Sequence, residues 1–135
     1  MTEIGISKDK PEIYEKLHKQ FNVEWDSGLI IADGKTIHCK FDIPPAKFIH
    51  ELVHIKQQEK TGKSLWWELY LAKPEFRLEQ EVEAYKAEYR FFSENVNDRN
   101  MRFDYLYEIA RTLASEQYGK LCTGDEALRL IQQVV

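Results

Sequence analysis

Three residues spaced along one predicted helix could together bind and use a metal ion. His50 and His54 are four residues apart, and Glu51 directly follows the first histidine, in the sequence HELVH. Residues four apart on an α-helix lie on the same face, so both imidazoles can reach one ion. The carboxylate of Glu51 can approach a metal-bound water without binding the metal, and can act as its general base. The alternative interpretation is a helix that carries two incidental histidines.

The motif lies in residues 46–60, where the pattern predicts a buried helix. Pro44 and Pro45 precede this segment, and proline is tolerated in a first helical turn. Gly62 follows it and suits a C-terminal cap. Apolar residues cover much of the circumference, which is typical of a helix buried on most sides: Phe48, Ile49, Leu52, Val53 and Ile55. Buried histidines need partners for their ring nitrogens, and a metal with outer acceptors would supply them.

A zinc site built on these two histidines needs a third protein ligand. Cys39 and Cys122 are not part of a CxxC pair, which argues against a cysteine ligand. His18 and His38 lie upstream, on segments whose patterns predict exposed positions. A carboxylate from the long helix predicted over residues 74–95 therefore remains as the candidate.

Periodicity selects Glu81 from the carboxylates of that helix. Glu81 is about 60° from the centre of the helix's apolar stripe, whereas Glu79 is about 100° and Glu83 about 140° away, at ~100° per residue. Glu88 is about 80° from the centre and two turns further along. The residues of the stripe recur at spacings of four and three: Leu78, Val82, Tyr85, Tyr89 and Phe92.

With Glu81 in place, the chain resembles the gluzincin-type zinc metallopeptidases, including the minimal ones of bacteria and phages. The resemblance covers about residues 35–92 and rests on HExxH followed by E-x-E-A on the next long helix. It implies a zincin-like fold in which Glu81 is the third zinc ligand. The family has Asp or Asn four residues later, to orient a ligating histidine, and this chain has Tyr85. The resemblance also implies that an extended peptide adds to an upstream strand edge, here residues 35–43.

The implied function is zinc-dependent hydrolysis of peptide bonds in a peptide or protein substrate. Zn²⁺ held by His50, His54 and Glu81 would lower the pKa of a bound water toward about 7 and polarise the scissile carbonyl. Glu51 would take the proton of the water and pass it to the leaving amine. A donor that stabilises the oxyanion is also expected, and several side chains are available: Tyr85, Tyr89, Tyr105, Tyr107 and Arg111.

A second hypothesis is a zincin-like fold that serves binding or assembly, with structural zinc or with no catalytic zinc. The small size of the chain favours it, as does Tyr85 at the position where the family has Asp or Asn. Trp66 and Trp67 form a dense aromatic patch that could bind a partner, although packing in the core is the more common use of such residues. An open fourth metal position would favour catalysis, and a protein side chain there would favour structure.

The rest of the pattern predicts an α+β domain, predominantly α, with a small N-terminal sheet packed on the HExxH helix. Strand-like runs at residues 28–32 and 35–43 are joined by Asp33-Gly34, a strong hairpin signal. A capping box, Thr123 to Glu126, starts the last helix. Further helices are predicted over residues 11–21, 65–72 and 102–118.

Composition limits the classes of partner and location. The 135 residues are 43% hydrophobic and 31% charged, which is typical of one globular domain, predicted over residues 1–135. The net charge of -4 and the lack of a basic stretch argue against nucleic-acid binding. No apolar run reaches the length of a membrane span, and the N-terminus lacks a signal-peptide pattern. We therefore expect a cytoplasmic protein with free cysteines and no membrane partner. The sequence does not indicate an oligomeric state.

Overall fold

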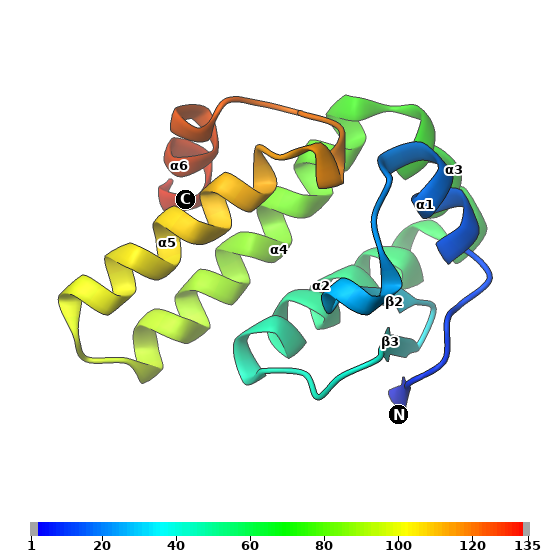
Figure 1. Ribbon diagram of the computed structural model, residues 1–135, viewed down its shortest axis with the longest axis horizontal. Coiled ribbons are helices and arrows are strands. Elements are labelled where there is room, and N and C mark those ends of the chain that lie inside the picture. The colour runs from blue at the N-terminus through cyan, green and yellow to red at the C-terminus, as the bar shows by residue number, and fades with distance from the viewer. Residues whose placement is uncertain (1–2, 134–135) are drawn as a thin grey trace.

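Helices make up most of the chain, and a short three-stranded sheet accompanies them (Figure 1). The computed structural model describes residues 3–133 and confirms an α+β architecture that is mainly helical. None of the helices in these residues is both long and apolar enough to span a membrane. The α-helices are α1 (Tyr14–Phe21), α2 (Pro45–Thr61), α3 (Lys63–Ala72), α4 (Pro74–Asn95), α5 (Arg99–Leu113) and α6 (Gly124–Gln132).

The sheet has the order β1-β3-β2, with β1 at Gly5–Ser7, β2 at Ile30–Asp33 and β3 at Thr36–Cys39. Strand β3 is central, because β1 pairs with it in parallel and β2 in antiparallel fashion. The expectation that residues 35–43 offer a free strand edge to a peptide is therefore wrong. The sequence pattern did not reveal β1, whose partner lies some thirty residues away. Strand β2 is an edge strand of the sheet, and it is the one that lies next to α2.

The β2–β3 hairpin forms as predicted, but its turn is displaced by one residue. Asp33 pairs with Thr36, so the two central residues are Gly34 and Lys35 rather than Asp33 and Gly34. Among the described residues, the only non-glycine residues with a positive φ are Asn22 and Lys120. The φ of Lys35 is therefore negative. Gly34 has φ of 67°, and a positive φ at the first central position alone is the pattern of a type II′ turn.

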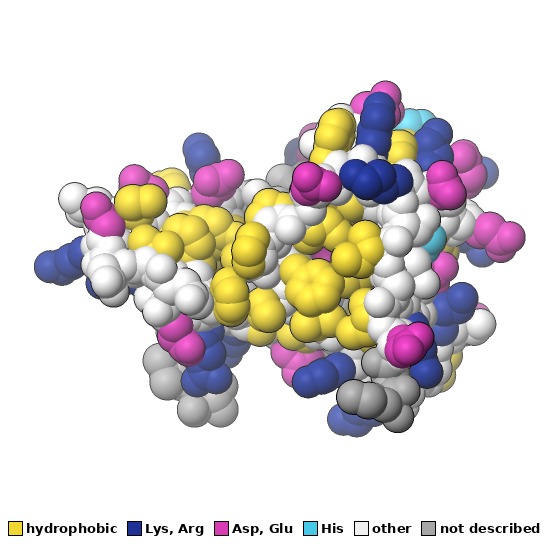
Figure 2. Space-filling model, turned by 90° about the horizontal axis from the view of Figure 1, so that it is seen from below, with side chains coloured by type: hydrophobic (Ala, Val, Ile, Leu, Met, Phe, Trp, Pro, Cys, Tyr) yellow, Lys and Arg dark blue, Asp and Glu magenta, His cyan; other side chains and the backbone are white. Residues whose placement is uncertain are grey.

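Helix α2 begins at Pro45 and ends before Gly62, as the proline and glycine signals predict. Its burial differs from the prediction, because the most buried side chains include His50, Glu51, His54, Gln57 and Gln58. Four of its five predicted core residues are only half-buried: Phe48, Ile49, Leu52 and Val53. Hydrophobic side chains gather on the face of the molecule seen from below (Figure 2). The face of α2 that points into the protein is thus largely polar. Buried polar side chains are unusual unless they bind one another or a ligand.

Three hydrophobic clusters in the described part of the chain pack the helices and the sheet together. In the first, Trp66 and Trp67 of α3 pack against α1, and Trp66 is 1% exposed. The alternative in which these tryptophans line the core is thus confirmed. The second cluster joins α4, α5 and α6, and includes Leu106, Leu113 and Ile131. The third joins Ile55 of α2 to Ala32 and Ile37 of the sheet, and α2 also packs directly against α4.

The helix predicted over residues 102–118 is two elements. Helix α5 ends at Leu113, and a 3₁₀ helix, η2 (Glu116–Tyr118), follows it. Ser115 explains the break, because its Oγ accepts a hydrogen bond from the backbone N–H of Gln117 and so caps η2. Phe103, predicted to face inward, is 53% exposed. The break turns Tyr118 toward the interior, where it is 8% exposed.

Candidate metal centre

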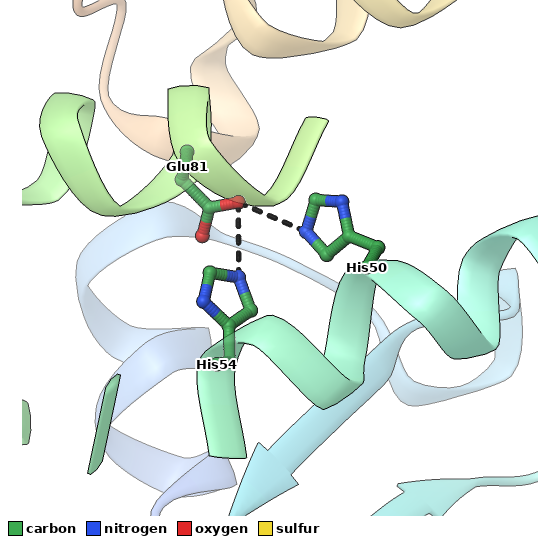
Figure 3. A group of neighbouring side chains, drawn as sticks. All are labelled: His50, His54 and Glu81. Carbon is green, nitrogen blue, oxygen red and sulfur yellow. Dashed lines mark hydrogen bonds and ion pairs between the residues drawn. The ribbon is translucent and has the colours of Figure 1, made fainter. Parts of the chain in front are cut away.

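Helices α2 and α4 bring His50, His54 and Glu81 together in the interior (Figure 3). Their potential ligand atoms all lie within 4.8 Å of one another. Oε1 of Glu81 is 3.1 Å from Nε2 of His50 and 3.2 Å from Nε2 of His54. All three residues are at most 5% exposed. Among residues 3–133, this group of two imidazoles and one carboxylate could hold a metal ion.

The outer nitrogen of each imidazole has a fixed acceptor. Nδ1 of His50 lies 2.9 Å from Oε1 of Glu88, and a carboxylate only accepts, so this Nδ1 carries a proton. Nδ1 of His54 lies 2.8 Å from Oε1 of Gln57. The amide of Gln57 is oriented by its nitrogen, which donates to the carbonyl of Gln80 and to Glu83. Both Nε2 atoms are thereby directed to the centre, which is how metal-binding histidines are held.

Glu81 offers one oxygen to the centre, because the other is engaged elsewhere. The hydroxyl of Tyr70 donates to Oε2 of Glu81 at 2.6 Å. Tyr70 belongs to the cluster of α1 and α3, and is 5% exposed. This bond turns Oε1 toward the two histidines and fits a carboxylate that binds a metal through a single oxygen. The residues present therefore suit a metal in ligand type, orientation and outer hydrogen bonds.

Glu88 was set aside by periodicity, yet it is fully buried and lies at the centre's outer side. Besides His50, its carboxylate binds Nζ of Lys47 at 2.8 Å and the hydroxyl of Tyr105. The signal that could have found it is the spacing from Glu81 to Glu88, because seven residues are about two helical turns and return to the same face. The apolar stripe did not predict the buried face of α4, because that face includes three charged residues. The buried residues of α4 are Arg77, Glu81, Ala84, Tyr85 and Glu88.

Tyr85 packs against His50 but does not orient it through a hydrogen bond. Its ring packs edge-on against the ring of His50, with centroids 4.4 Å apart. Its hydroxyl is 2.7 Å from the hydroxyl of Tyr118 and makes no bond to a histidine. Glu88 supplies the acceptor for His50 from one turn further along α4. Glu88, and not Tyr85, thus orients the ring of His50.

Glu51 lies beside the centre, where it can act on a group bound there. Its Oε2 is 3.8 Å from Nε2 of His50, and the residue is 6% exposed. A cavity of about 440 Å³ opens in front of it and is lined by parts of α2, α4, η2 and the segment before β2. His50, Glu51, Tyr85, Glu88 and Tyr118 are among its lining residues. His50 is therefore accessible from this cavity.

Burial and close charges shift the acid–base properties of the centre. Burial disfavours a charged His50, but hydrogen bonds to Glu81 and Glu88 outweigh it and raise the pKa of His50 to about 10. Burial also opposes ionisation of Glu81, but the charge of His54 and hydrogen bonds to both histidines lower its pKa. Burial raises the pKa of Glu51, which makes it a stronger base than an exposed carboxylate.

The other candidates from the sequence lie away from the centre or have partners. His18 contacts the carbonyl of Val23, and His38 contacts the carbonyl of Asp9, so neither joins the cluster. Of the possible oxyanion donors, Tyr105 is bound to Glu88. Tyr107 and Arg111 are exposed on α5, and Tyr89 packs in the second hydrophobic cluster. Tyr118 was missed, because the predicted continuous helix gave it no distinct position.

The metal-free protein is expected to lose stability as the pH rises from 6.5 to 10. The pKa of His50 is raised from 6.5 to about 10, so its contribution to the free energy of unfolding is complete below 6.5 and lost as the pH rises through 10. Zinc affinity should rise over the same range, because metal binding requires neutral imidazoles. Urea unfolding of chelator-treated protein at several pH values measures the first trend. His50→Gln should flatten it, and an equal stability of wild type from pH 6.5 to 10 would contradict it.

No family model, curated protein or solved structure matches this chain. The residues of the centre form a buried His-His-Glu group with oriented imidazoles, a neighbouring carboxylate and an accessible side. Such a group could hold a metal ion.

Proposed function

We propose that this chain is a zinc-dependent peptidase of the gluzincin type with a zincin-like fold. The observation that carries the proposal is the cluster of His50, His54 and Glu81, with Glu51 beside it at the floor of an open cavity. Two imidazoles and one carboxylate are a ligand set of catalytic zinc, and they leave a fourth position for water or substrate. Zinc bound there would lower the pKa of a water to about 7 and polarise the scissile carbonyl.

Glu51 is the general base in this proposal. Its raised pKa suits a group that takes a proton from water and then gives it to the leaving amine. Its place one residue after His50 holds it beside the ligands, while a metal on the Nε2 atoms of His50 and His54 would keep both imidazoles from taking that proton. The chain's own residues thus divide the work: three hold the metal, and one moves the proton.

The edge of β2 is where an extended peptide substrate would bind. The side-chain amide of Gln58 already occupies one part of this edge, since it donates to the carbonyl of Ala32 at 2.7 Å and accepts from the N–H of Gly34 at 2.6 Å. Leu29 and Ile30, at the other end, line the cavity in front of Glu51. Strand addition would therefore take place beside Leu29 and Ile30 and lead the peptide to the metal centre.

The alternative is a zincin-like protein that serves binding or assembly and uses zinc for structure. A protein side chain in the fourth ligand position would support it. In the part of the chain that the structure describes, the group that could hold a metal comprises three residues, and one of them, His50, lines the cavity. Trp66 and Trp67, which could have formed a binding surface, are core residues instead. These observations favour catalysis over the alternative.

Replacing Glu51 with glutamine tests the proposed function. Glu51→Gln should bind zinc as wild type does, because Glu51 is outside the ligand group. Its hydrolysis of unfolded casein should fall by about 10² to 10⁴, the usual contribution of a general base. Glu59→Gln, an exposed position on the same helix, is the matched control and should keep both properties. Equal hydrolysis by Glu51→Gln and wild type would overturn the role of Glu51. A zinc-loaded wild type that cleaves no unfolded protein would favour the binding alternative.

A further inference from the structure

Two tyrosine hydroxyls meet at the wall of the cavity next to the metal centre. Tyr85 on α4 and Tyr118 on η2 have their hydroxyl oxygens 2.7 Å apart, and the residues are 3% and 8% exposed. Both line the cavity in front of Glu51. Tyr118 also lines a smaller cavity of about 60 Å³ that is bordered by His54 and Glu81. The pair therefore lies on the side of the centre that a substrate would approach.

The two hydroxyls together have one donor more than they use. Each phenol carries one proton, and the single bond between them consumes one donor. Within residues 3–133, neither hydroxyl makes a further hydrogen bond. An ordinary phenol has a pKa of about 10, so both hydroxyls carry their protons at neutral pH. One buried O–H at the cavity wall is thus left to donate, and a buried donor without an acceptor is costly.

Tyr118 is better placed than Tyr85 to use that proton. Tyr85 borders the larger cavity, whereas Tyr118 borders both cavities that meet at the metal centre. If Tyr85 donates to Tyr118, the proton of Tyr118 is free to point toward a bound group. The other hydroxyls near the centre are already engaged, since Tyr70 donates to Glu81 and Tyr105 to Glu88.

The backbone around Tyr118 is held firmly in place. The guanidinium of Arg77 is buried, and its Nε–H donates to the carbonyl of Tyr118 at 2.8 Å. Gly119 follows with φ of 88°, and a Cβ there would lie 3.1 Å from Arg77 and 3.2 Å from Phe21. Arg77 also stacks over the ring of Phe21, 4.8 Å from its centroid. A donor fixed in this way needs little reorganisation when charge develops beside it, which is what makes such donors effective.

We propose that Tyr118 donates its hydroxyl proton in a hydrogen bond to the substrate oxygen that becomes negatively charged when water adds to the scissile carbonyl, and that Tyr85 positions Tyr118. This inference rests on the proposed peptidase function. It assigns the oxyanion donor to a residue outside the set that the sequence offered. Tyr118 is a catalytic residue on this account, because it touches the reacting oxygen, and Tyr85 is a positioning residue.

Phosphate binding to the cobalt-substituted protein tests the inference without turnover. Inorganic phosphate is a tetrahedral oxyanion that can bind the metal and accept from Tyr118, and visible absorption of Co²⁺ follows its binding. Tyr118→Phe should raise the dissociation constant of phosphate about tenfold, the usual effect of losing a hydrogen bond to a charged group. Tyr85→Phe should raise it by a smaller factor. Imidazole binds the metal and needs no donor, so its dissociation constant should be the same in all variants.

The controls separate this inference from the proposed function. Tyr107→Phe removes an exposed hydroxyl on α5 and should leave both constants at their wild-type values. Equal phosphate affinity in Tyr118→Phe and wild type, with cobalt bound, would overturn the inference and leave the metal centre standing. An equal weakening of phosphate and imidazole would also overturn it, because it would show a general disturbance of the site. Failure of wild type to bind cobalt would overturn the metal centre and this inference together.

Discussion

Replacing Glu81 with glutamine is expected to lower zinc affinity by more than about 100-fold. Residues that only orient ligands are worth about 10- to 100-fold, so the loss of a ligand should cost more. The carboxylate of Glu81 provides the one negative charge shared by both imidazoles, through contacts of 3.1 and 3.2 Å. Glutamine keeps the shape and can still accept from Tyr70, but it removes that charge. Competition with a chromophoric chelator measures the zinc affinity.

The matched control for Glu81 is Glu79→Gln on the same helix. Glu79 is exposed, and its replacement changes net charge by the same amount without touching the centre. Its zinc affinity should equal that of wild type. If Glu81→Gln bound zinc as tightly as Glu79→Gln, Glu81 would not be a ligand, and the three-residue centre would have to be abandoned.

Replacing Glu88 with alanine is expected to weaken zinc binding by about 10- to 100-fold and to destabilise the protein. The first effect follows because Glu88 accepts from Nδ1 of His50, and such acceptors fix the ring and its tautomer. The second follows because alanine would leave the buried Nδ1–H of His50 without its charged partner, at a cost of about 3 kcal/mol. Lys47 is partly exposed and can turn to water, so it should add little. Chelator competition and urea unfolding measure the two effects.

Glu88→Gln separates the two roles of the Glu88 carboxylate. The amide oxygen of glutamine can still accept from His50, so much of the zinc affinity should return, whereas the charge pairing with Lys47 is lost. Glu94→Ala, at an exposed position near the end of α4, is the control for helix propensity. Wild-type zinc affinity in Glu88→Ala would show that His50 is oriented without Glu88. Another group would then have to orient the ring.

Local signals in the sequence predicted the elements that carry the site. Pro45 and Pro74 mark the starts of α2 and α4, and Gly62 marks the end of α2. These signals are reliable because they act through the backbone: proline fits a first helical turn, and glycine tolerates the φ of 96° found at Gly62. The capping box from Thr123 to Glu126 is likewise confirmed at the start of α6. The helical spacing of His50 and His54 was enough to place both on one face.

The partners of the centre could not be predicted in the same way. Hydrophobic periodicity assumes that polar residues face water, but α2 and α4 bury polar groups that satisfy one another. Glu88 and Gln57 were overlooked for this reason. Periodicity did select Glu81, because it is the carboxylate of α4 that lies nearest to the apolar stripe. Strand β1 and Tyr118 depend on contacts with distant segments, which leave no local pattern in the chain.

Metal analysis of the protein purified without added zinc tests the central claim most directly. Native mass spectrometry of the folded chain should show about one zinc ion per molecule, and His54→Ala should show none while circular dichroism reports the same helix content. Both results are expected, because the three proposed ligands are already assembled and both imidazoles are oriented. A folded wild-type chain that carries no metal, and that takes up none when zinc is supplied, would contradict it.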